Sequence, residues 1–361
     1  MLIKIQIKLE MKKVSILVST IDSGGAEKQA VLLASQLSLY TEVNLLILYG
    51  DYAEYQHNVA ILAESTVKVH KLVGCMLSKI RQVRRIIKVS ETGVLLNYLT
   101  LPDFVGSLVG RMCGIRVYNG IRNSRMPKAK ILMEKIAHNY WAPGTIYNCY
   151  SGAEYFANLG FIRKKNIVIP NCFPNIEAPI IRPNHEIKTI ITVGRFDSQK
   201  DYKTLIESVA KLARNDFRLC IVGYGVLERQ IRAWVKECNI ENKTDIFIKP
   251  NNVSELERNA DIYISTSLFE GTSNSIMEAL NWSLPVVATN VGDNERLVID
   301  GKNGYLHAIG DTRGIAESLS ILLDSSELRN KMGTKSNQIL RENYSMEIFE
   351  KRYVELIEEE N

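Results

Sequence analysis

Short apolar runs alternate with longer segments of helical spacing along most of the chain. In the first half, β-branched and aromatic runs predict strands at 13–20, 42–49, 67–72, 94–98, 116–119 and 145–150. Segment 76–88, between two of these runs, has its apolar residues on one helical face and its basic residues on another. Repeated strand-then-helix units predict an α/β fold in which helices cover a parallel sheet.

A proline-rich segment, 169–188, interrupts this pattern. It holds four of the nine prolines and shows no periodicity, which is typical of an interdomain linker. The alternation then restarts, and strands are predicted at 188–196, 217–225, 245–250, 261–266 and 285–289. The last of these is the final buried strand that the pattern predicts. A chain of 361 residues is long enough for two domains, which we place at 1–175 and 186–343.

One polar turn in the second domain carries the strongest chemical signal. Strand 261–266 leads into Glu270, then into four small or polar residues at 271–274, and then into a helical pattern that contains Glu278. Ser275 and Glu278 have the S-x-x-E spacing of a capping box, which predicts that the helix starts there. The unpaired backbone amides at such a start, together with the helix dipole, favour binding of an anion.

Two carboxylates beside an anion site suit a ligand with both charged and hydroxyl-rich parts. A nucleotide sugar is such a ligand, because its diphosphate would contact the amides while each carboxylate accepts hydrogen bonds from a pair of hydroxyls. The alternative is that Glu278 only caps its helix and that Glu270 is a solvated loop charge.

Two other strand ends carry candidate ligand-binding residues. Arg195 and Lys200 lie at and after the end of strand 188–196, where two fixed cations would offset the charge of a departing nucleoside diphosphate. Gly24 and Gly25 follow the first strand and would let a ligand approach the backbone closely. The alternatives are ordinary loop charges for the first pair and a structural turn for the second.

Composition narrows the class of protein. Apolar residues make up 46% of the chain and charged residues 24%, as in a globular protein, and no apolar run reaches the roughly 20 residues that cross a bilayer. The start shows no secretory leader, and we expect the ten residues before Met11 to be an extension or an upstream start. The six cysteines lack disulfide or zinc spacing, which favours reduced core residues in a cytoplasmic protein.

Charge is distributed unevenly between the two halves. Residues 1–175 hold 22 Lys and Arg against 11 Asp and Glu, whereas the remainder holds 23 against 29. Basic residues concentrate in segments 76–88 and 122–135. We expect this half to face an anionic membrane surface, and a solvated helix face is the alternative. Nucleic acid is not an expected partner, because neither segment has interleaved aromatic residues or a known reading module.

Five motifs, in order and across most of the chain, resemble those of glycosyltransferase family 4. Members of that family are retaining, nucleotide-sugar-dependent enzymes with the two-domain GT-B fold. EGTSNSIMEAL (270–280) resembles the family's Glu-x7-Glu signature. The other motifs are STIDSGGAEKQ (19–29), VGRFDSQKDYKTLI (193–206), IVGYG (221–225) and VATNVGDNERLVIDGKNGYLH (287–307).

The resemblance implies a role for each matching residue. Glu270 would contact the transferred sugar, while Arg195 and Lys200 hold the diphosphate, and these three residues would carry catalysis. The remaining donor-binding residues would be Gly24, Gly25, Gly271, Thr272, Ser273, Asn274 and, at the ribose, Glu278. The first domain would bind the acceptor and the second the donor, and a C-terminal helix at about 344–361 would pack back onto the first domain. No metal or other cofactor is expected, and the chain has no Asp-x-Asp motif.

The chain departs from the family pattern in three places. Where many members carry a histidine in the acceptor domain, this sequence reads YNGIRNSR. Arg122 is the candidate acceptor-binding residue there, and a membrane-facing or solvated cation is the alternative. Lys249 and Asp293 stand where the family commonly has glycine. These departures affect base and sugar recognition rather than the class of reaction.

The sequence therefore predicts a cytoplasmic glycosyltransferase that is peripheral on the inner face of the cell membrane. It would move a hexose or N-acetylhexosamine from a nucleotide donor to a glycan, expected to be lipid-linked, in cell-surface polysaccharide biosynthesis. The expected donor is a UDP-sugar, with a GDP-sugar as the alternative. The rival functions are a nucleotide-sugar epimerase or hydrolase of the same fold, and a non-catalytic partner of another transferase that binds nucleotide sugar or glycan.

Overall fold

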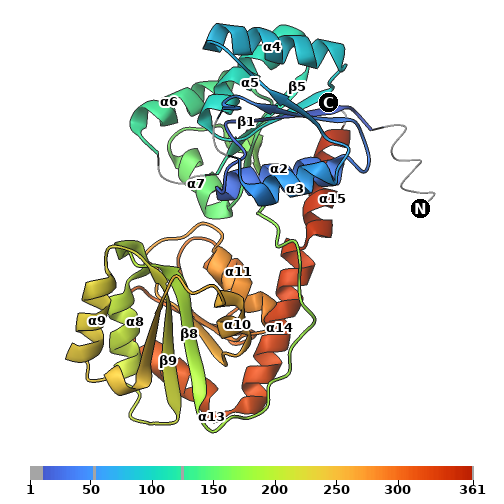
Figure 1. The fold of residues 1–361 in the computed structure, drawn as a ribbon. Helices are drawn as coiled ribbons and strands as arrows, with labels where there is room; N and C mark the ends of the chain where they lie inside the picture. The colour runs from blue at the N-terminus through green and yellow to red at the C-terminus, as the bar shows by residue number, and fades with distance from the viewer. Residues whose placement is uncertain (1–10, 52–53, 123–125, 360–361) are drawn as a thin grey trace. The chain divides into compact units, whose positions relative to one another are not determined.

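The structure is a computed structural model that describes residues 11–51, 54–122 and 126–359 (Figure 1). The extension predicted before Met11 lies outside the described residues, as do positions 123–125 of the basic segment 122–135. The chain divides into two compact units. Unit 1 runs to Cys172 and also includes the chain from Glu347 onward, and unit 2 is Phe173–Met346.

Unit 1 is built on a seven-stranded parallel sheet with the order β3-β2-β1-β4-β5-β6-β7. Its strands are β1 (Val14–Val18), β2 (Val43–Ile47), β3 (Lys68–Lys71), β4 (Val94–Asn97), β5 (Arg116–Ile121), β6 (Gly144–Tyr147) and β7 (Asn166–Val168). Each of the six runs predicted in this half overlaps one of these strands. Strand β7 was not predicted, because a strand of three half-buried residues at a sheet edge has no apolar pattern of its own.

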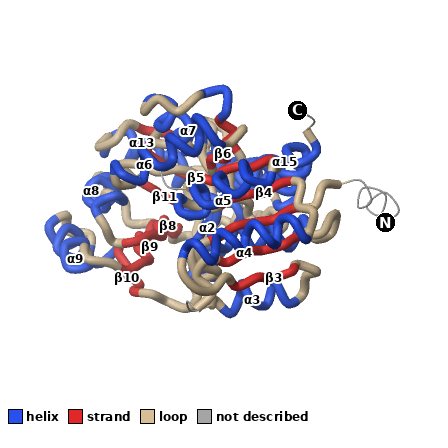
Figure 2. Tube along the Cα trace, turned by 90° about the horizontal axis from the view of Figure 1, so that it is seen from above, coloured by secondary structure: helices blue, strands red, loops and turns tan. Residues whose placement is uncertain are grey.

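Helices cover both faces of this sheet. They are α2 (Gly25–Leu37), α3 (Gln56–Ala63), α4 (Met76–Val89), α5 (Thr100–Cys113), α6 (Lys128–Ile136), a π-helical turn η1 (Ala137–Trp141), α7 (Tyr150–Asn158) and a 3-10 turn η2 (Arg163–Lys165). Helices α4 and α5 pack on one face and α2 and α3 on the other, so β1, β2 and β4 are buried along their whole length (Figure 1). Strand β3 is left at the edge of the sheet (Figure 2).

The last helix, α15 (Met346–Glu358), packs on unit 1. Phe349, Tyr353, Leu356 and Ile357 are its buried residues, close to the apolar stripe seen in the sequence. The Tyr353 hydroxyl lies 3.3 Å from the hydroxyl of Tyr98, the residue that follows β4. The apolar stripe of this otherwise charged segment is therefore the face by which α15 packs on unit 1.

Unit 2 is built on a six-stranded parallel sheet with the order β10-β9-β8-β11-β12-β13. Its strands are β8 (Lys188–Arg195), β9 (Phe217–Tyr224), β10 (Thr244–Ile248), β11 (Ile262–Ser265), β12 (Val286–Thr289) and β13 (Gly304–His307). The prediction that 285–289 holds the last buried strand is confirmed, because β12 is buried along its whole length, but the strand after it, β13, was not predicted. Only Gly304 of β13 is fully buried, so this edge strand lacks the apolar run that identifies a central strand.

The helices of unit 2 follow the same alternation. They are η3 (Ser198–Lys200), α8 (Tyr202–Ala210), α9 (Glu228–Glu237), η4 (Glu241–Lys243), α10 (Val253–Arg258), α11 (Asn274–Asn281), α12 (Asn294–Leu297), α13 (Thr312–Asp324) and α14 (Ser326–Tyr344). Within the described ranges, none of the helices is long and apolar enough to cross a membrane.

Part of the proline-rich segment expected as a linker is fastened along unit 2. The backbone N–H of Glu177 donates to Asn281 Oδ1 at 2.8 Å, and that of Ile180 donates to Ser283 Oγ at 3.0 Å. The guanidinium of Arg182 donates to the carbonyl oxygens of Ser283 and Arg258 at 2.9 and 3.1 Å. Prolines prevent this segment from forming a helix or a central strand, but its backbone groups find partners on unit 2.

Each sheet has one point where the strand order reverses direction. In unit 1 this point lies between β1 and β4, and in unit 2 it lies between β8 and β11. In open α/β sheets, ligands bind outside the carboxyl ends of the strands at such a point. The segments that follow β8 and β11 are therefore where a ligand of unit 2 is expected.

Candidate active site

Lys200 and Glu270 form an ion pair at the reversal point of unit 2. Lys200 ends η3, after β8, and Glu270 lies in the loop after β11. The Lys200 Nζ is 2.6 Å from Glu270 Oε1, and the two side chains are only 16% and 9% exposed. Ser267 Oγ donates to the same carboxylate oxygen at 2.7 Å. The alternative that Glu270 is a solvated loop charge is therefore wrong.

Hydrogen bonds between the two loops hold this pair in place. The Gln199 side-chain amide donates to the carbonyl of Phe269 at 2.8 Å, and the backbone N–H of Leu268 donates to the carbonyl of Gln199 at 2.8 Å. Thr266 Oγ1 donates to the carbonyl of Lys200 at 3.0 Å. Gln199 and Ser267 were not identified from the sequence, because a single polar loop residue gives no pattern signal.

Arg195 lies at the same sheet edge but does not join this pair. Its side chain is 67% exposed, and its guanidinium is 3.5 Å from Asp197 Oδ2. Because most of its side chain is exposed, Arg195 is available to a ligand at the end of β8.

Close packing of β8 on β9 explains Gly223, because a Cβ on Gly223 would lie 1.9 Å from the carbonyl oxygen of Gly194.

The turn after Glu270 leads into helix α11, but the predicted capping box is wrong. The helix begins at Asn274 with Ser273 as the N-cap, so Ser275 is already inside it. The Ser273 hydroxyl makes no capping hydrogen bond and lies 3.3 Å from the Ser275 hydroxyl. Because Glu278 lies five residues after the N-cap, it is too far along the helix to complete a capping box.

The turn is closed by the loop that follows β12. The backbone N–H of Asp293 donates to the carbonyl of Gly271 at 3.3 Å. Gly292 has a φ of +57°, and a Cβ there would lie 2.2 Å from the carbonyl oxygen of Glu270. A glycine is required at position 292 on both counts, whereas Asp293, one of the departures from the family pattern, is buried beside it. Thr272 lies in the turn, between Gly271 and the N-cap residue Ser273.

Glu278 lies half-buried on α11, close to a second acid that the sequence did not reveal. Glu257 on α10 is 2% exposed, and burial raises its pKa to about 8, with a further contribution from the charge of Glu278. A hydrogen bond from Trp282 partly opposes this rise. Glu257 therefore stays protonated at neutral pH, beside one of the two carboxylates expected to hold the donor.

Lys249 directly follows strand β10 and has a φ of +45°, an uncommon value for a residue with a side chain. Its ammonium lies 4.5 Å from the ring centroid of Tyr224, at the end of β9. This family departure therefore places a cation and an aromatic ring together at the carboxyl edge of the same sheet.

In unit 1, Gly24 and Gly25 follow β1 as predicted. Gly24 is the N-cap of α2, and its N–H donates to Asp22 Oδ1 at 2.8 Å. A Cβ on Gly24 would lie 2.1 Å from Glu27 Oε2, whereas a Cβ on Gly25 would meet nothing within 4 Å. The end of the flexible Glu27 side chain could move away from a Cβ at position 24, so the local structure gives no strong steric reason for either glycine.

Arg122 follows β5 and is buried, with 9% of its surface exposed. One guanidinium nitrogen donates to the Tyr353 hydroxyl at 2.8 Å, and the group lies 4.4 Å from the centroid of the Tyr98 ring. The other two guanidinium nitrogens have no hydrogen-bond partner in the described part of the chain. The alternative of a solvated or membrane-facing cation is therefore wrong.

Two buried acids lie near Arg122. Asp103 on α5 accepts a hydrogen bond from the backbone N–H of Gly120 at 2.8 Å, and Glu134 on α6 lies close to it. Burial raises the pKa of both carboxyls, and each carboxyl is further affected by the other. No pattern in the sequence indicates this pair, because the two acids come from separate helices.

The described residues contain no candidate metal-binding site. No three His, Cys, Asp or Glu side chains gather there as metal ligands would. The expectation that the reaction needs no metal stays a prediction.

Comparison with known proteins agrees with the geometry of unit 2. Residues 176–339 match the family model described as "Glycosyl transferases group 1". The chain is 26% identical, over 90% of its length and 94% of the relative, to the N-acetylgalactosamine-N,N'-diacetylbacillosaminyl-diphospho-undecaprenol 4-alpha-N-acetylgalactosaminyltransferase of Campylobacter jejuni. It is 30% identical, over 51% of its length and 53% of the relative, to an uncharacterized glycosyltransferase of Haemophilus influenzae.

Solved structures show the same architecture over the whole chain. Anabaena HepE in complex with UDP aligns with a TM-score of 0.78 at 17% identity, covering 96% of this chain and 99% of that one. The lipopolysaccharide outer core galactosyltransferase WaaB aligns with a TM-score of 0.77 at 15% identity and the same coverage. Residues 176–339 therefore match the glycosyl transferases group 1 model, the chain has the GT-B fold, and its relatives over most of its length support a glycosyltransferase.

Proposed function

We propose that this glycosyltransferase moves a hexose or N-acetylhexosamine, with retention, from a UDP-sugar to a lipid-linked glycan during synthesis of a cell-surface polysaccharide. The observation that carries the proposal is the Lys200–Glu270 pair at the reversal point of the unit 2 sheet. In this pair, the Lys200 ammonium would bind a phosphate and the Glu270 carboxylate would accept hydrogen bonds from sugar hydroxyls.

Donor binding would exchange the partners of this pair. The diphosphate would compete with Glu270 for Lys200, and the freed carboxylate would accept hydrogen bonds from the hydroxyls of the sugar. As the bond to the sugar breaks, negative charge develops on the leaving diphosphate. Lys200, together with Arg195 at the end of β8, would stabilise that charge more strongly in the transition state than in the ground state.

The remaining donor contacts are proposed from the same edge of the sheet. The backbone amides at Gly271, Thr272, Ser273 and Asn274 precede α11 and would contact the phosphate or the sugar, and Glu278 would bind the ribose. Gly24 and Gly25 of unit 1 would approach the diphosphate through their backbone. No step of this proposal requires a metal.

The acceptor is proposed from the relatives. The Campylobacter jejuni enzyme named above acts, by its name, on a diphospho-undecaprenol glycan, and a second relative from that organism also acts on a glycan linked to undecaprenol diphosphate. Arg122 is the cation of unit 1 that we propose to contact such an acceptor, through the nitrogens that lack a partner among the described residues.

A lipid-linked acceptor requires the enzyme to work at a membrane, and helix α4 supports this. Its exposed side carries Arg81, Arg84, Arg85 and Lys88, and the helix has no acidic residue. Leu77 and Val89, which are 56% and 78% exposed, lie on the same helix. We therefore propose peripheral binding to the anionic cytoplasmic face of the cell membrane.

Vesicle binding tests the membrane part of this proposal. Vesicles with anionic lipid should bind the protein, and binding should weaken as salt rises from about 0.05 M to about 0.5 M, because the screening length falls over that range from above roughly 10 Å to a few Å. Equal binding to neutral vesicles would contradict it.

A thermal-shift screen against UDP-, GDP- and dTDP-sugars tests the donor. A ligand that binds only the folded protein raises its free energy of unfolding, by about 2.7 kcal/mol when the ligand concentration is a hundred times Kd, and so raises the melting temperature. We expect a UDP-sugar, UDP-N-acetylgalactosamine first, to give the largest shift, and transfer to a diphospho-undecaprenol glycan to follow. Release of free nucleotide or of an altered sugar without an acceptor would favour the epimerase or hydrolase, and binding without any turnover would favour the non-catalytic partner.

A further inference from the structure

The C-terminal helix α15 brings a buried tyrosine hydroxyl to the carboxyl edge of the unit 1 sheet. Tyr353 of this helix is fully buried, and its hydroxyl accepts a hydrogen bond from Arg122 Nη2 at 2.8 Å. The Tyr98 hydroxyl lies 3.3 Å from the same oxygen, which can donate its own proton to Tyr98. Arg122 and Tyr98 follow the neighbouring strands β5 and β4, and β4 borders the point where the strand order reverses.

Packing alone does not require a tyrosine at position 353. The apolar stripe of α15 also holds Phe349, Leu356 and Ile357, and the rings of Phe349 and Tyr353 pack edge to face with their centroids 4.9 Å apart. A phenylalanine at position 353 would keep these contacts without burying a hydroxyl, which costs free energy unless it is hydrogen-bonded. The reason for the hydroxyl is therefore its bond to the guanidinium of Arg122.

Two contacts hold this guanidinium from different directions. The Tyr353 hydroxyl bonds to one nitrogen, and the ring centroid of Tyr98 lies 4.4 Å from the guanidinium carbon, within the range of a cation–π contact. A long arginine side chain otherwise samples many rotamers, so these contacts orient Arg122 before a ligand binds. Its Nε and Nη1 have no hydrogen-bond partner among the described residues.

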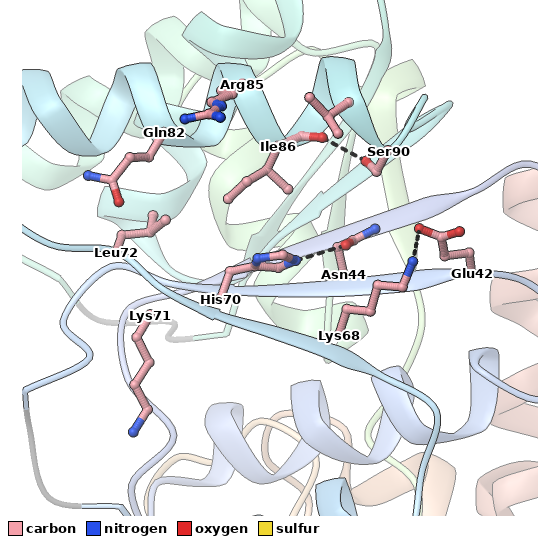
Figure 3. A pocket seen from close by; sticks show the side chains of 11 residues that line it. Glu42, Asn44, Lys68, His70, Lys71, Leu72, Gln82, Arg85, Ile86 and Ser90 are labelled. Carbon is pink, nitrogen blue, oxygen red and sulfur yellow. Dashed lines mark hydrogen bonds and ion pairs between the residues drawn. The ribbon is translucent and has the colours of Figure 1, made fainter.

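A buried guanidinium with unused N–H groups suits an anionic ligand group. The anionic part of a glycan linked to a lipid diphosphate is the diphosphate, whose oxygens accept such hydrogen bonds. The groove between α4 and the edge strands β2 and β3 is a weaker candidate in unit 1, because Lys68 in that groove already pairs with Glu42 at 2.8 Å (Figure 3).

Two buried acids near Arg122 do not take the place of a ligand. Asp103 Oδ2, like the two nitrogens of Arg122, has no hydrogen-bond partner in the described part of the chain. Burial and the neighbouring Glu134 raise the pKa of Asp103, and burial also raises the pKa of Glu134. Both shifts favour a neutral carboxyl, which leaves the charge of Arg122 available to an anion.

We propose that Tyr353 is a positioning residue of the acceptor site, which holds Arg122 in the orientation that presents Nε and Nη1 to the diphosphate of the acceptor. The proposal rests on the acceptor role proposed for Arg122 above. It goes further in two respects, because it names the part of the acceptor that Arg122 binds and gives a function to a hydroxyl of the C-terminal helix.

NMR of the Arg122 Nε–H group tests the site without requiring turnover. Its signal is the one that Arg122→Lys removes, and the probe is geranyl diphosphate, a water-soluble isoprenoid diphosphate. We expect the probe to shift this signal in a saturable way. No shift would overturn both the acceptor role of Arg122 and the positioning role of Tyr353. An equal shift by the uncharged methyl N-acetylgalactosaminide would overturn the assignment to the diphosphate.

A matched pair of variants separates positioning of Arg122 from docking of α15. Tyr353→Phe removes the hydroxyl to which Arg122 donates and keeps the ring, whereas Tyr40→Phe removes a hydroxyl that donates to Glu350 on the same helix. We expect Tyr353→Phe to weaken binding of the probe about fivefold or more, and Tyr40→Phe to change it by less than about twofold. Equal effects of the two variants would mean that docking of α15 is sufficient, and the positioning role would be wrong.

Transfer kinetics show which part of the account fails. With a diphospho-undecaprenol glycan as acceptor, Tyr353→Phe should raise KM for the acceptor about fivefold or more and leave KM for the nucleotide sugar within about twofold. A lower melting temperature with an unchanged acceptor KM would give Tyr353 a structural role only. An unchanged acceptor KM in Arg122→Lys would contradict the acceptor role itself. Failure of the unmodified protein to bind any nucleotide sugar is a separate result, which would contradict the proposed function.

Discussion

At the scale of single residues, the candidate site contains ionisable side chains that are largely buried. Lys200 and Glu270 compensate each other's charge, so both stay charged although they are largely buried. Glu257 is different, because no cation among the described residues is a cause of its pKa shift and burial raises that pKa instead.

This rise predicts a pH dependence of stability. Between its ordinary pKa of 4.5 and its folded pKa of about 8, Glu257 keeps its proton in the native state and loses it in the unfolded state. Rising pH therefore lowers the free energy of unfolding over that window, by about 1.4 kcal/mol per pH unit from this group. Glu257→Gln is neutral throughout and should lack this contribution.

Urea unfolding at pH 5 and at pH 8 checks the prediction. The stability of Glu257→Gln relative to the unmodified protein should be greater at pH 8 than at pH 5. An equal difference at both values would mean that Glu257 is ionised in the native protein at pH 5.

At the scale of elements, the glycine pair before α2 separates a structural role from a functional one. Gly25→Ala adds a methyl group that meets nothing within 4 Å and places a better helix former at the first position of α2. The melting temperature should therefore stay the same or rise slightly. If the donor approaches the backbone here, the added methyl group should raise KM for the nucleotide sugar about tenfold or more.

Gly24→Ala is the useful contrast, because its methyl group would displace the Glu27 carboxylate at the start of α2, whereas that of Gly25→Ala displaces nothing. Steady-state kinetics and the melting temperature of both variants show whether the glycine pair has a structural role or contacts the donor. An unchanged KM in Gly25→Ala would remove the glycine pair from the donor site.

The elements also show what the sequence could predict and what it could not. Buried central strands such as β1 and β11 were predicted because both faces are covered, which requires a continuous apolar run. The edge strands β7 and β13 were not, because half-exposed strands leave no such run. The start of α11 was misplaced by one residue or two, because Ser273 and Ser275 are equally good N-caps by type.

The same limit applies to the site. Glu270, Lys200 and Arg195 were found because they follow strands in a motif, and the structure brings the first two into contact. Partners that come from distant parts of the chain gave no signal. Tyr353 reaches Arg122 from 231 positions away, and Glu257 lies close to Glu278 from another helix.

At the scale of the molecule, the two units carry different chemistry. Unit 2 holds most of the residues proposed for the donor, and unit 1 holds the excess positive charge, the glycine pair and Arg122. The charge balance of the sequence already indicated this division. The structure adds that the basic residues of 76–88 lie together on one exposed side of helix α4.

The measurement that tests the central claim most directly is calorimetric titration of the nucleotide sugar into Lys200→Met and Lys203→Met. Both variants remove one lysine from the same short segment, but the Lys203 side chain is 60% exposed and its ion pair among the described residues is with Glu207 on its own helix. Loss of a charged contact costs about 1.5–3 kcal/mol, so Lys200→Met should bind about ten- to a hundredfold more weakly. Lys203→Met should bind within twofold of the unmodified protein, and wild-type affinity in Lys200→Met would contradict the account.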